Sequence, residues 1–411
     1  GTPRTIADLA GSTSGWVHGD DRGHALTSNR MTAPRKDLAA DVAIRPVRSA
    51  RQFLDLQRGF YRGDPNYVPP VTTAESWQLE PAKSPFFEHG ELARFAAFRG
   101  EDCVGRISAS RDRLHDEFHR DEVGFFGHFE ASDEAAAHAL LGHAAAWCQA
   151  RSATALRGPV DMSTNYRCGL LIDGRPGPPV MMMPYNPPEY ADWIESFGLL
   201  KCKDLLALHG TSESLDRPRM DKLTQRIQKR TGIRLRRVDL RQFERECQVL
   251  WGLYQRIWER NWGFVPMTEP EFLAQARDLK RVEHPSLMHI AEKQQQPIGF
   301  VLAVPDTNVG ARACDGRLLP FGWWKFLRAM RKKRLRRVLT LGAVPEYRKT
   351  GLDMLLMHRV MSDGIDAGFD ACEASWILED NHDMLGPLQT LGCTPYRRYR
   401  IYERPLAELI G

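Results

Sequence analysis

The 411-residue sequence lacks several patterns that would assign it to a well-defined class of proteins. Its eight cysteines are scattered, without a Cys-x-x-Cys pair or a Cys/His cluster at the spacing of zinc ligands, which excludes a zinc finger and a dense disulfide framework. Apolar runs are too short for a membrane-spanning helix, which needs about 18 residues or more. The N-terminus also lacks the apolar segment of a signal peptide, so we expect a cytoplasmic protein.

An excess of one charge is missing too. The formal net charge is only +5, and no basic strand interleaved with aromatic residues occurs, so we expect no nucleic-acid partner. Five histidines of the first half show no metal-ligand spacing, and we expect no metal cofactor: His115, His119, His128, His138 and His143. With 42% hydrophobic and 27% charged residues, the chain suits two globular domains.

The two halves of the sequence share one plan. The hairpin sequence CVGRISA, which contains Gly105, has a counterpart in PIGFVLA, which contains Gly299, 194 positions later. The sequence WIESFGLLKC, with Gly198, has a counterpart in PLQTLGCTPY, with Gly392, again 194 positions later. Two independent features at one offset indicate a tandem duplication.

The duplication and the local composition suggest the domain organisation. Residues 1–40 are rich in Gly, Ser, Thr, Asp and Arg without periodicity, so we expect a flexible tail, in which Met31 suits a natural start. A polar stretch over 212–219 separates the halves. We therefore predict one domain over 41–213 and a second over 214–411.

The most informative stretch is RRVLTLGAVPEYRKTGLD, from Arg336 to Asp353. It predicts a buried strand over 338–344, a turn led by proline, a basic loop ending at Gly351, and an amphipathic helix. Backbone N–H groups at the start of such a helix point to one place, where the helix dipole and the side chains of Arg348 and Lys349 favour an anion. The stretch therefore predicts a phosphate-binding loop.

The pattern Arg348-x-x-Gly351-x-Asp353 resembles the pyrophosphate loop of the GNAT family of acyl-CoA-dependent N-acyltransferases, usually Gln/Arg-x-x-Gly-x-Gly/Ala. The surroundings resemble the family as well, because a second strand, CEASWILEDN, follows the helix and leads to another helix and strand. The resemblance implies an α/β protein of tandem GNAT folds, each with a mixed, mostly antiparallel central sheet flanked by helices. The first half lacks the loop, resembles the degenerate partner in double-GNAT proteins, and is not expected to bind CoA.

The resemblance also implies which residues bind acyl-CoA, the expected cosubstrate. The strand before the loop would offer backbone N–H groups at Gly342, Ala343 and Val344 to the thioester carbonyl and the pantetheine arm. Main-chain amides of the loop would hold the pyrophosphate: Arg348, Lys349, Thr350, Gly351 and Leu352. A Cβ at position 351 would lie between the backbone and the phosphate, which explains a glycine there.

Two positions near this site have alternative interpretations. The family has Gly or Ala where this chain has Asp353, so Asp353 either changes how the diphosphate binds or is an ordinary acidic residue in the first helical turn. Asn381 matches an asparagine that in the family binds the pantetheine arm or an ordered water. The alternative for Asn381 is a helix N-cap.

Proton transfer needs further groups, because an acceptor ammonium in water has a pKa of about 10.4. Glu379 and Asp380 follow the strand at which the family often has a general base, and we favour Glu379. Many members have a tyrosine acid seven residues after the asparagine, but this chain has Leu388 there. Tyr399 on the next strand is a candidate substitute, and packing against the sheet is the alternative role.

The segment over 318–337, LLPFGWWKFLRAMRKKRLRR, has apolar and aromatic residues ahead of eight Lys and Arg residues. Such a stretch suits an anionic membrane surface, an acidic acyl carrier protein, the phosphates of CoA, or a solvated helix over the sheet. We predict a peripheral contact with the inner membrane through 318–337.

These features together predict an enzyme that moves an acyl group from acyl-CoA to an amine by direct attack in a ternary complex. The basic, aromatic-led segment and a similarity to GNAT-type proteins linked to bacterial sphingolipid synthesis favour a long acyl chain and a sphingoid-type lipid amine. One alternative is an acetyl-CoA-dependent N-acetyltransferase of small amines. Another is a non-catalytic protein that binds CoA or serves as a scaffold.

Overall fold

The computed structural model describes residues 42–409 except positions 283, 332 and 333. The tail expected over residues 1–40 therefore lies outside the described residues. The first half comprises β1 (Ala43–Pro46), α1 (Ala50–Asp55), α2 (Gln57–Phe60), α3 (Thr72–Glu75), β2 (Gly90–Arg99), β3 (Asp102–Asp112), α4 (Arg113–His119), β4 (Val123–Ala131), α5 (Glu134–Gln149), β5 (Ala155–Gly158), β6 (Leu170–Asp173), α6 (Glu189–Ser196) and β7 (Leu200–Thr211). The second half comprises α7 (Arg217–Thr231), β8 (Arg234–Arg237), α8 (Phe243–Trp258), α9 (Glu269–Lys280), β9 (Met288–Lys293), β10 (Gln296–Pro305), α10 (Asn308–Ala313), α11 (Gly322–Met330), β11 (Leu335–Ala343), α12 (Leu352–Asp366), β12 (Ala371–Leu378), α13 (His382–Thr390), β13 (Thr394–Pro405) and α14 (Leu406–Leu409).

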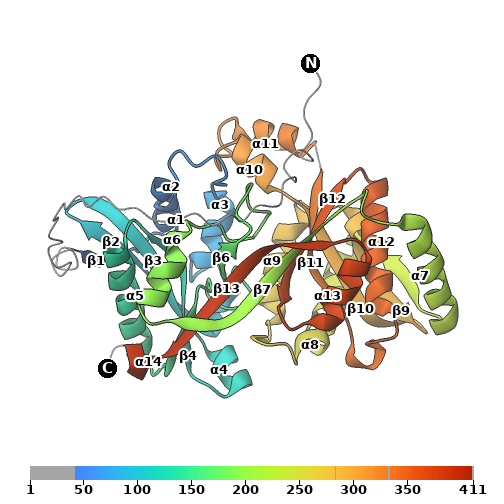
Figure 1. The fold of residues 1–411 in the computed structure, drawn as a ribbon, viewed down its shortest axis with the longest axis horizontal. Helices are drawn as coiled ribbons and strands as arrows, with labels where there is room; N and C mark the ends of the chain where they lie inside the picture. The colour runs from blue at the N-terminus through green and yellow to red at the C-terminus, as the bar shows by residue number, and fades with distance from the viewer. Residues whose placement is uncertain (1–41, 283, 332–333, 410–411) are drawn as a thin grey trace, which may run out of the picture. The chain divides into compact units, whose positions relative to one another are not determined.

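The two halves share one sheet of 13 strands. The strand order is β1-β2-β3-β4-β5-β13-β7-β12-β11-β10-β9-β8, with β6 paired to β13. The last strand of each half lies in the other half, because β7 pairs with β12 and β13 pairs with β5. Figure 1 shows β7 and β13, which pair with each other, running side by side through the middle of the sheet. The expected tandem of mixed, mostly antiparallel sheets flanked by helices is confirmed, and the exchange of strands joins the two halves.

The exchanged strands bear on the predicted domain ranges. The boundary between 213 and 214 falls in the turn from β7 to α7. Both β7 and β13 pair with strands from either side of that boundary, and the described residues belong to one compact unit. The ranges 41–213 and 214–411 therefore stay a prediction about sequence repeats.

Each half contains one parallel strand pair. β4 and β5 pair only at Val123–Phe125 with Ala155–Arg157, and β11 and β12 only at Leu335–Val338 with Ala371–Ala374. Every other pairing of described strands is antiparallel. After these short contacts the parallel strands separate, and each stays paired with its antiparallel neighbour. The sheet therefore opens at two equivalent places.

Local sequence signals set the ends of several elements. The first-half hairpin turns between Arg99 and Asp102. Asp133 caps α5, since its side chain accepts a hydrogen bond from the N–H of Ala136 at 2.9 Å. The helix predicted after Gly351 is α12, and its predicted apolar positions are all buried: Leu352, Leu355, Leu356, Met357 and Val360. These residues form a single core with α7, α8 and the neighbouring strands.

The segment over 318–337 differs from its prediction as one amphipathic stretch. Its helix, α11, ends at Met330, and β11 begins at Leu335. Arg336 and Arg337 are therefore strand residues, each with 1% of its surface exposed. Arg337 donates to Ser375 Oγ at 2.9 Å and to the carbonyl of Met181 at 2.7 Å. Both buried arginines donate hydrogen bonds to groups in the interior, so they do not belong to the exposed basic surface.

The structure also bears on membrane spanning. Among the described residues, every helix is too short or too polar to cross a lipid bilayer.

Candidate functional site

A pocket lies where β11 and β12 separate. Up to Val338 the two strands are paired, but farther on β11 continues with β10 while β12 continues with β7. The register on β10 moves from Ala303 opposite Val338 to Leu302 opposite Thr340, so Leu339 is an extra residue in a β-bulge. A bulge leaves its extra residue outside the regular ladder and turns the strand. The gap thus opens beside irregular backbone.

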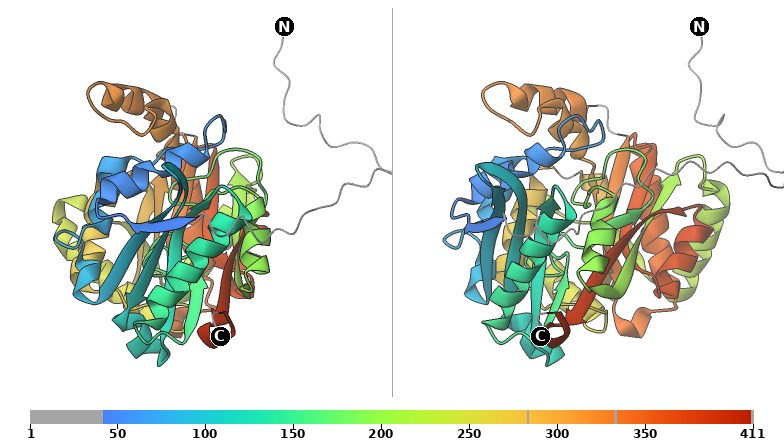
Figure 2. Two further views of the ribbon diagram at one scale, coloured as in Figure 1. Left: turned by 90° about the vertical axis from the view of Figure 1, so that its left-hand side faces the viewer. Right: turned by 60° about the vertical axis from the view of Figure 1, so that its left-hand side comes forward.

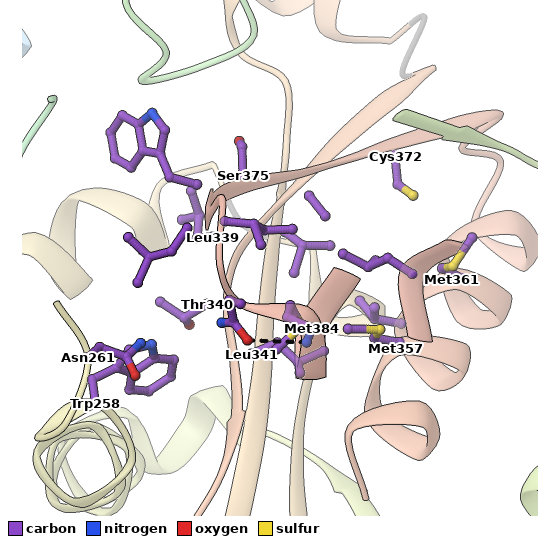
Figure 3. Close-up of a pocket in the computed structure, with 18 residues that line it drawn as sticks. Trp258, Asn261, Leu339, Thr340, Leu341, Met357, Met361, Cys372, Ser375 and Met384 are labelled. Atoms are coloured by element: carbon purple, nitrogen blue, oxygen red, sulfur yellow. Dashed lines mark hydrogen bonds between the residues drawn. The ribbon is translucent and has the colours of Figure 1, made fainter. Parts of the chain in front are cut away.

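The pocket is partly open to solvent and has two different ends. Figure 3 shows Trp258 and Asn261 at one end and Met357 and Met361 at the other, with Thr340 between them. The remaining lining residues are Val338, Leu339, Leu341, Val360, Cys372, Ala374, Ser375, Trp376, Ile377, Leu378, Asn381, Met384 and Leu388. One end therefore has an amide and an indole, and the other is apolar and rich in methionine.

The residues that line the pocket include polar atoms with different hydrogen bonding. Thr340 Oγ1 and Trp376 Nε1 are buried and have no hydrogen-bond partner among the described residues. A buried donor without a partner is costly, so such groups usually mark a place that a ligand or water completes. Asn381 lines the pocket and also caps α13, because its side chain accepts from the N–H of Met384 at 3.2 Å. The cap interpretation of Asn381 is confirmed, and it leaves the Asn381 amide at the pocket wall.

The loop between β11 and α12, where the sequence predicted an anion site, is held by hydrogen bonds within the protein. Arg348 donates to the carbonyl of Ile257 at 2.6 Å, and Thr350 donates to the carbonyl of Tyr347 at 2.7 Å. Gly351 caps α12 with φ of 91°, a conformation that favours glycine. A Cβ on Gly351 would lie 3.0 Å from the side chain of Ile227. Gly351 is thus needed by its backbone angle and by α7, and the loop ends at a helix N-terminus as predicted.

Asp353 lies in the first turn of α12, beside this loop. Burial raises the pKa of its carboxyl to about 6, and the charge of Arg348 works in the opposite direction. A carboxyl with this pKa is protonated more easily than an ordinary aspartate.

The three strand residues expected to hold the thioester lie just past the pocket. Gly342 and Ala343 stay paired with β10, and the N–H of Val344 donates to the carbonyl of Ile298 at 2.9 Å. A Cβ on Gly342 would lie 2.4 Å from Ile257, so this glycine lets α8 pack closely on β11. None of the three lines the pocket, which instead uses the strand residues from Val338 to Leu341.

The proposed proton-transfer groups also lie outside the pocket lining. Glu379 accepts from Lys201 Nζ at 2.8 Å and from the N–H of Asp204 at 3.1 Å. Asp380 accepts from Lys203 Nζ at 2.9 Å, and this contact lowers the pKa of Asp380. Tyr399 is fully buried in the core between the halves, and burial raises the pKa of its hydroxyl. Asn381 therefore lines the pocket, whereas the side chains of the three proposed proton-transfer residues do not.

Sequence reasoning missed the α8 contribution to the site. Trp258 is the last residue of α8, and Asn261 follows it in the loop toward α9. Trp258 stacks on Tyr254 at 5.2 Å between ring centroids, and its ring meets Phe300 edge-on at 5.6 Å. The sequence WERNWGF contains an aromatic and amide cluster just after an amphipathic helix, which was the available signal. The position of this cluster beside the gap between β11 and β12 depends on long-range strand pairing.

The first half has a second hollow at its own strand opening, with different chemistry. This hollow is lined by charged side chains that include Arg106, Glu130, Asp161 and Arg167. No basic loop precedes α5, whose cap Asp133 forms an ion pair with Arg99 at 2.9 Å. The two openings therefore favour different ligands.

One group of described side chains is close enough to hold a metal ion: His115, Asp116 and Asp121. Arg157 donates to His115 Nε2 at 3.2 Å, which places the ring proton of a neutral imidazole on Nδ1. That nitrogen faces Asp121 at 3.2 Å and Asp116 at 3.5 Å. In that tautomer Nδ1 carries the proton and does not ligate a metal, and it has no hydrogen-bond partner among the described residues.

Comparisons with known proteins give the following similarities. No protein-family model matches the chain. Protein YghO of Escherichia coli (strain K12) is 34% identical over 364 residues, covering 87% of this chain and 93% of that protein. A bacterial ceramide synthase of Caulobacter vibrioides (strain NA1000 / CB15N) is 32% identical over 381 residues, covering 89% of this chain and 98% of that protein.

Solved structures share the fold. A tandem GNAT protein from the clavulanic acid biosynthesis pathway has a TM-score of 0.55 at 13% identity, covering 89% of this chain and 98% of that one. A GCN5-related N-acetyltransferase from Sphaerobacter thermophilus has a TM-score of 0.51 at 11% identity, covering 91% and 97%.

Proposed function

This chain belongs to the family of tandem GNAT-fold proteins that includes YghO and the bacterial ceramide synthase, and on that basis we propose that it transfers an acyl group from acyl-CoA to an amine. The observation that carries the proposal is the pocket between β11 and β12, on the strand that leads to the anion-binding loop. A thioester is already activated, so the protein needs chiefly to position it and to stabilise the oxyanion. Attack is direct, in a ternary complex.

The proposed path of CoA follows β11. The diphosphate lies on the loop from Arg348 to Leu352 and on the N-terminus of α12. The pantetheine arm runs beside Gly342, Ala343 and Val344 and past the amide of Asn381. The thioester then reaches the bulge at Leu339, where the ladder is interrupted and Thr340 Oγ1 has no hydrogen-bond partner among the described residues.

The proposed acyl group is long. Met357, Met361 and Met384 line the apolar part of the pocket. Methionine side chains adapt to flexible ligands, and an apolar, methionine-lined wall suits an acyl chain better than an acetyl group alone requires. The proposed acceptor is a sphingoid-type lipid amine, in line with the name of the Caulobacter relative.

Glu379 is the proposed general base, with Asp380 beside it, and Tyr399 is the proposed acid. Burial raises the pKa of Tyr399, so its hydroxyl is protonated at neutral pH but is a weaker acid than an ordinary tyrosine. Glu379→Gln and Tyr399→Phe test these roles through the pH profile of kcat. A loss of one limb of the profile supports the assigned role. An unchanged profile contradicts it.

A lipid acceptor requires access to a membrane. We therefore propose a cytoplasmic protein in peripheral contact with the inner membrane through the segment 318–337, with no nucleic-acid partner and no metal cofactor.

The experiment is a calorimetric titration with CoA, acetyl-CoA and palmitoyl-CoA, the last below its micelle concentration. The variant Gly351→Glu places a bulky anion in the loop. Gly232→Glu is its control, because Gly232 also has a positive φ, of 70°, and nothing within 4 Å of its Cβ position. We expect palmitoyl-CoA to bind at least about tenfold more tightly than acetyl-CoA, because each buried methylene adds about 0.8 kcal/mol. The Gly351 variant loses binding and the control keeps it.

The other outcomes favour other functions. Equal binding of the three ligands, with turnover of small amines, favours an acetyl-CoA-dependent N-acetyltransferase. CoA binding without turnover of any amine favours a scaffold. Absence of binding to all three ligands contradicts the proposal.

A further inference from the structure

An insertion separates β10 from β11 in the second half. It contains α10 and α11 and the turns beside them, and we name its described residues, 306–331 and 334, the insertion hairpin. At the equivalent place the first half has only α4, between β3 and β4. Figures 1 and 2 show α10 and α11 standing away from the sheet in all three views. The duplication therefore does not explain the insertion hairpin.

The insertion hairpin exposes large apolar side chains. Leu319 and Phe321 are 80% and 76% exposed, and Trp324 and Leu327 are each 55% exposed. Together with Trp323, these residues are five of the nine large hydrophobic side chains exposed on the described chain. Five such residues within a nine-residue stretch form a patch, and patches of this kind mark interaction surfaces.

The charged side chains on the patch and directly after it are all cationic, and the acidic residue just before it, Asp315, forms an ion pair with Arg58. No Asp or Glu occurs over 316–345, whereas Arg317, Lys325, Arg328, Arg331 and Arg334 lie on or beside the hairpin. The guanidinium of Arg328 lies 5.5 Å from the ring centroid of Trp324. Cations and indole rings are therefore interleaved on one short helix, as on helices that lie in the interface of an anionic bilayer.

The insertion hairpin is fixed to the body of the protein, so its patch is presented on a stable support. Phe326 packs against α10, where a Cβ on Gly310 would lie 2.6 Å from its ring. Arg312 donates to the carbonyl of Pro65 at 2.7 Å, and Arg58 donates to the carbonyl of Asp315 at 3.0 Å. The patch stays exposed although the rest of the hairpin is packed.

We propose that the insertion hairpin docks on an anionic lipid surface. Phe321, Trp324 and Leu327 enter the boundary of the acyl chains, and the flanking Lys and Arg side chains contact lipid phosphates. A phospholipid surface fits better than an acidic carrier protein because the most exposed residues are apolar and the cations flank them. The chain runs from α11 directly into β11, whose residues from Val338 to Leu341 line the pocket. The docked hairpin thus places the pocket near the lipid, a consequence that rests on the proposed function.

The test is co-sedimentation of the full chain with phosphatidylcholine vesicles, with and without phosphatidylglycerol. The variant is Phe321→Ser/Trp324→Ser/Leu327→Ser. Leu200→Ser is the apolar control, since Leu200 on β7 is also 55% exposed. We expect binding only to the anionic vesicles, at least a tenfold loss of affinity in the triple variant, and none in the control. Added salt should weaken binding, because screening acts on exposed charges.

A second variant separates charge from insertion. The variant Arg328→Glu/Arg331→Glu should bind anionic vesicles at least tenfold more weakly than the unaltered chain. Its control, Arg241→Glu/Arg245→Glu, changes exposed residues elsewhere and should keep the full affinity. Equal binding of the triple variant and the unaltered chain, or equal binding to both vesicle types, overturns the proposal. A triple variant that still binds anionic vesicles but no longer binds an acidic acyl carrier protein also overturns the proposal.

The outcome is distinguishable from that of the proposed function. Acyl transfer to a water-soluble amine, measured without vesicles, should stay unchanged in the triple variant. Loss of vesicle binding with this activity intact supports the docking role.

Discussion

Arg106 on β3 lies directly opposite Glu130 on β4, and both side chains are buried. The same cross-strand position in the second half pairs Phe300 with Gly342. The first half therefore has an ion pair, with Nη2 and Oε1 3.6 Å apart, where the second half has a ring and a bare backbone. Three side chains donate to Glu130: Gln57 at 2.8 Å, Tyr61 at 2.8 Å and Tyr190 at 3.0 Å. The first half therefore has a buried polar network at the position where, in the second half, a helix packs closely on Gly342.

Replacing Arg106 with leucine should destabilise the protein strongly. The change leaves Glu130 buried without a cation, which typically costs about 3–5 kcal/mol of unfolding free energy. Burial raises the pKa of Glu130, and Arg106 opposes that rise. In the variant the raised pKa makes stability fall as the pH rises through it, so the loss should be larger at pH 8 than at pH 5.

The measurement is urea unfolding at both pH values. Arg113→Leu is the control, because Arg113 pairs with Glu117 on the surface and such pairs contribute about 0–1 kcal/mol. An equal, pH-independent loss in both variants would show that Arg106 acts by packing alone.

The sequence allowed the local structure of the second half to be predicted, because that structure follows from short-range chemistry. Apolar spacing located α12, and the basic loop ending at Gly351 located the start of that helix. The exchange of β7 and β13 was not predictable, since both strands have the same alternating pattern whichever neighbour they pair with. Arg336 and Arg337 were assigned to a basic surface because composition does not reveal that β11 begins at Leu335.

The pocket itself shows the same limit. Its walls arise where two paired strands separate, a feature of long-range register that leaves no periodicity in the sequence. Loop residues were identifiable from their chemistry, whereas Trp258 and Asn261 entered the site only through the packing of α8 on β11.

Binding of CoA should become tighter as the pH falls through about 6. Burial raises the pKa of Asp353 to about 6, so this carboxyl is mostly ionised at pH 7.5 and repels a diphosphate on the adjacent loop. Protonation removes the repulsion, and binding therefore takes up a proton. Asp353→Asn should bind CoA roughly tenfold more tightly at pH 7.5, which corresponds to about 1.4 kcal/mol, and should lose the pH dependence.

Calorimetry in buffers of different ionisation enthalpy measures this proton uptake. Asp366→Asn, at the other end of α12, is the control, because Arg217 holds the pKa of Asp366 below its usual range. An unchanged pH dependence in Asp353→Asn would place the diphosphate away from this carboxyl.

The length of the acyl chain should respond to position 361. Met361 lies at the apolar end of the pocket and is 2% exposed. Met361→Trp fills that end, so affinity for palmitoyl-CoA should fall about tenfold or more while affinity for acetyl-CoA stays the same. Met361→Ala enlarges it and should favour longer chains. Competition binding with a series of acyl-CoA lengths gives both results.

Met182→Trp is the control, since Met182 is largely exposed and does not line the pocket. Circular dichroism unfolding checks that Met361→Trp remains folded, because overpacking costs about 1–3 kcal/mol. Equal losses for acetyl-CoA and palmitoyl-CoA would mean that the acyl chain leaves the pocket by another route.

Thr340→Val should separate stability from activity. Thr340 Oγ1 is buried without a hydrogen-bond partner among the described residues, so replacing the hydroxyl with a methyl group of the same shape should raise the unfolding free energy by about 1 kcal/mol. If the hydroxyl donates to the thioester oxygen, kcat should fall about 100-fold, with palmitoyl-CoA affinity little changed. Thr340→Ser keeps the donor and should restore most of kcat.

The contrast with a satisfied hydroxyl completes the test. Thr224 is buried on α7 and donates to the carbonyl of Met220 at 2.8 Å. Thr224→Val should therefore lose about 1 kcal/mol of stability and leave kcat intact, the reverse of the result at Thr340. Loss of both stability and kcat in Thr340→Val would show that the hydroxyl holds the strand, and the thioester would then rely on the bulged backbone at Leu339 alone.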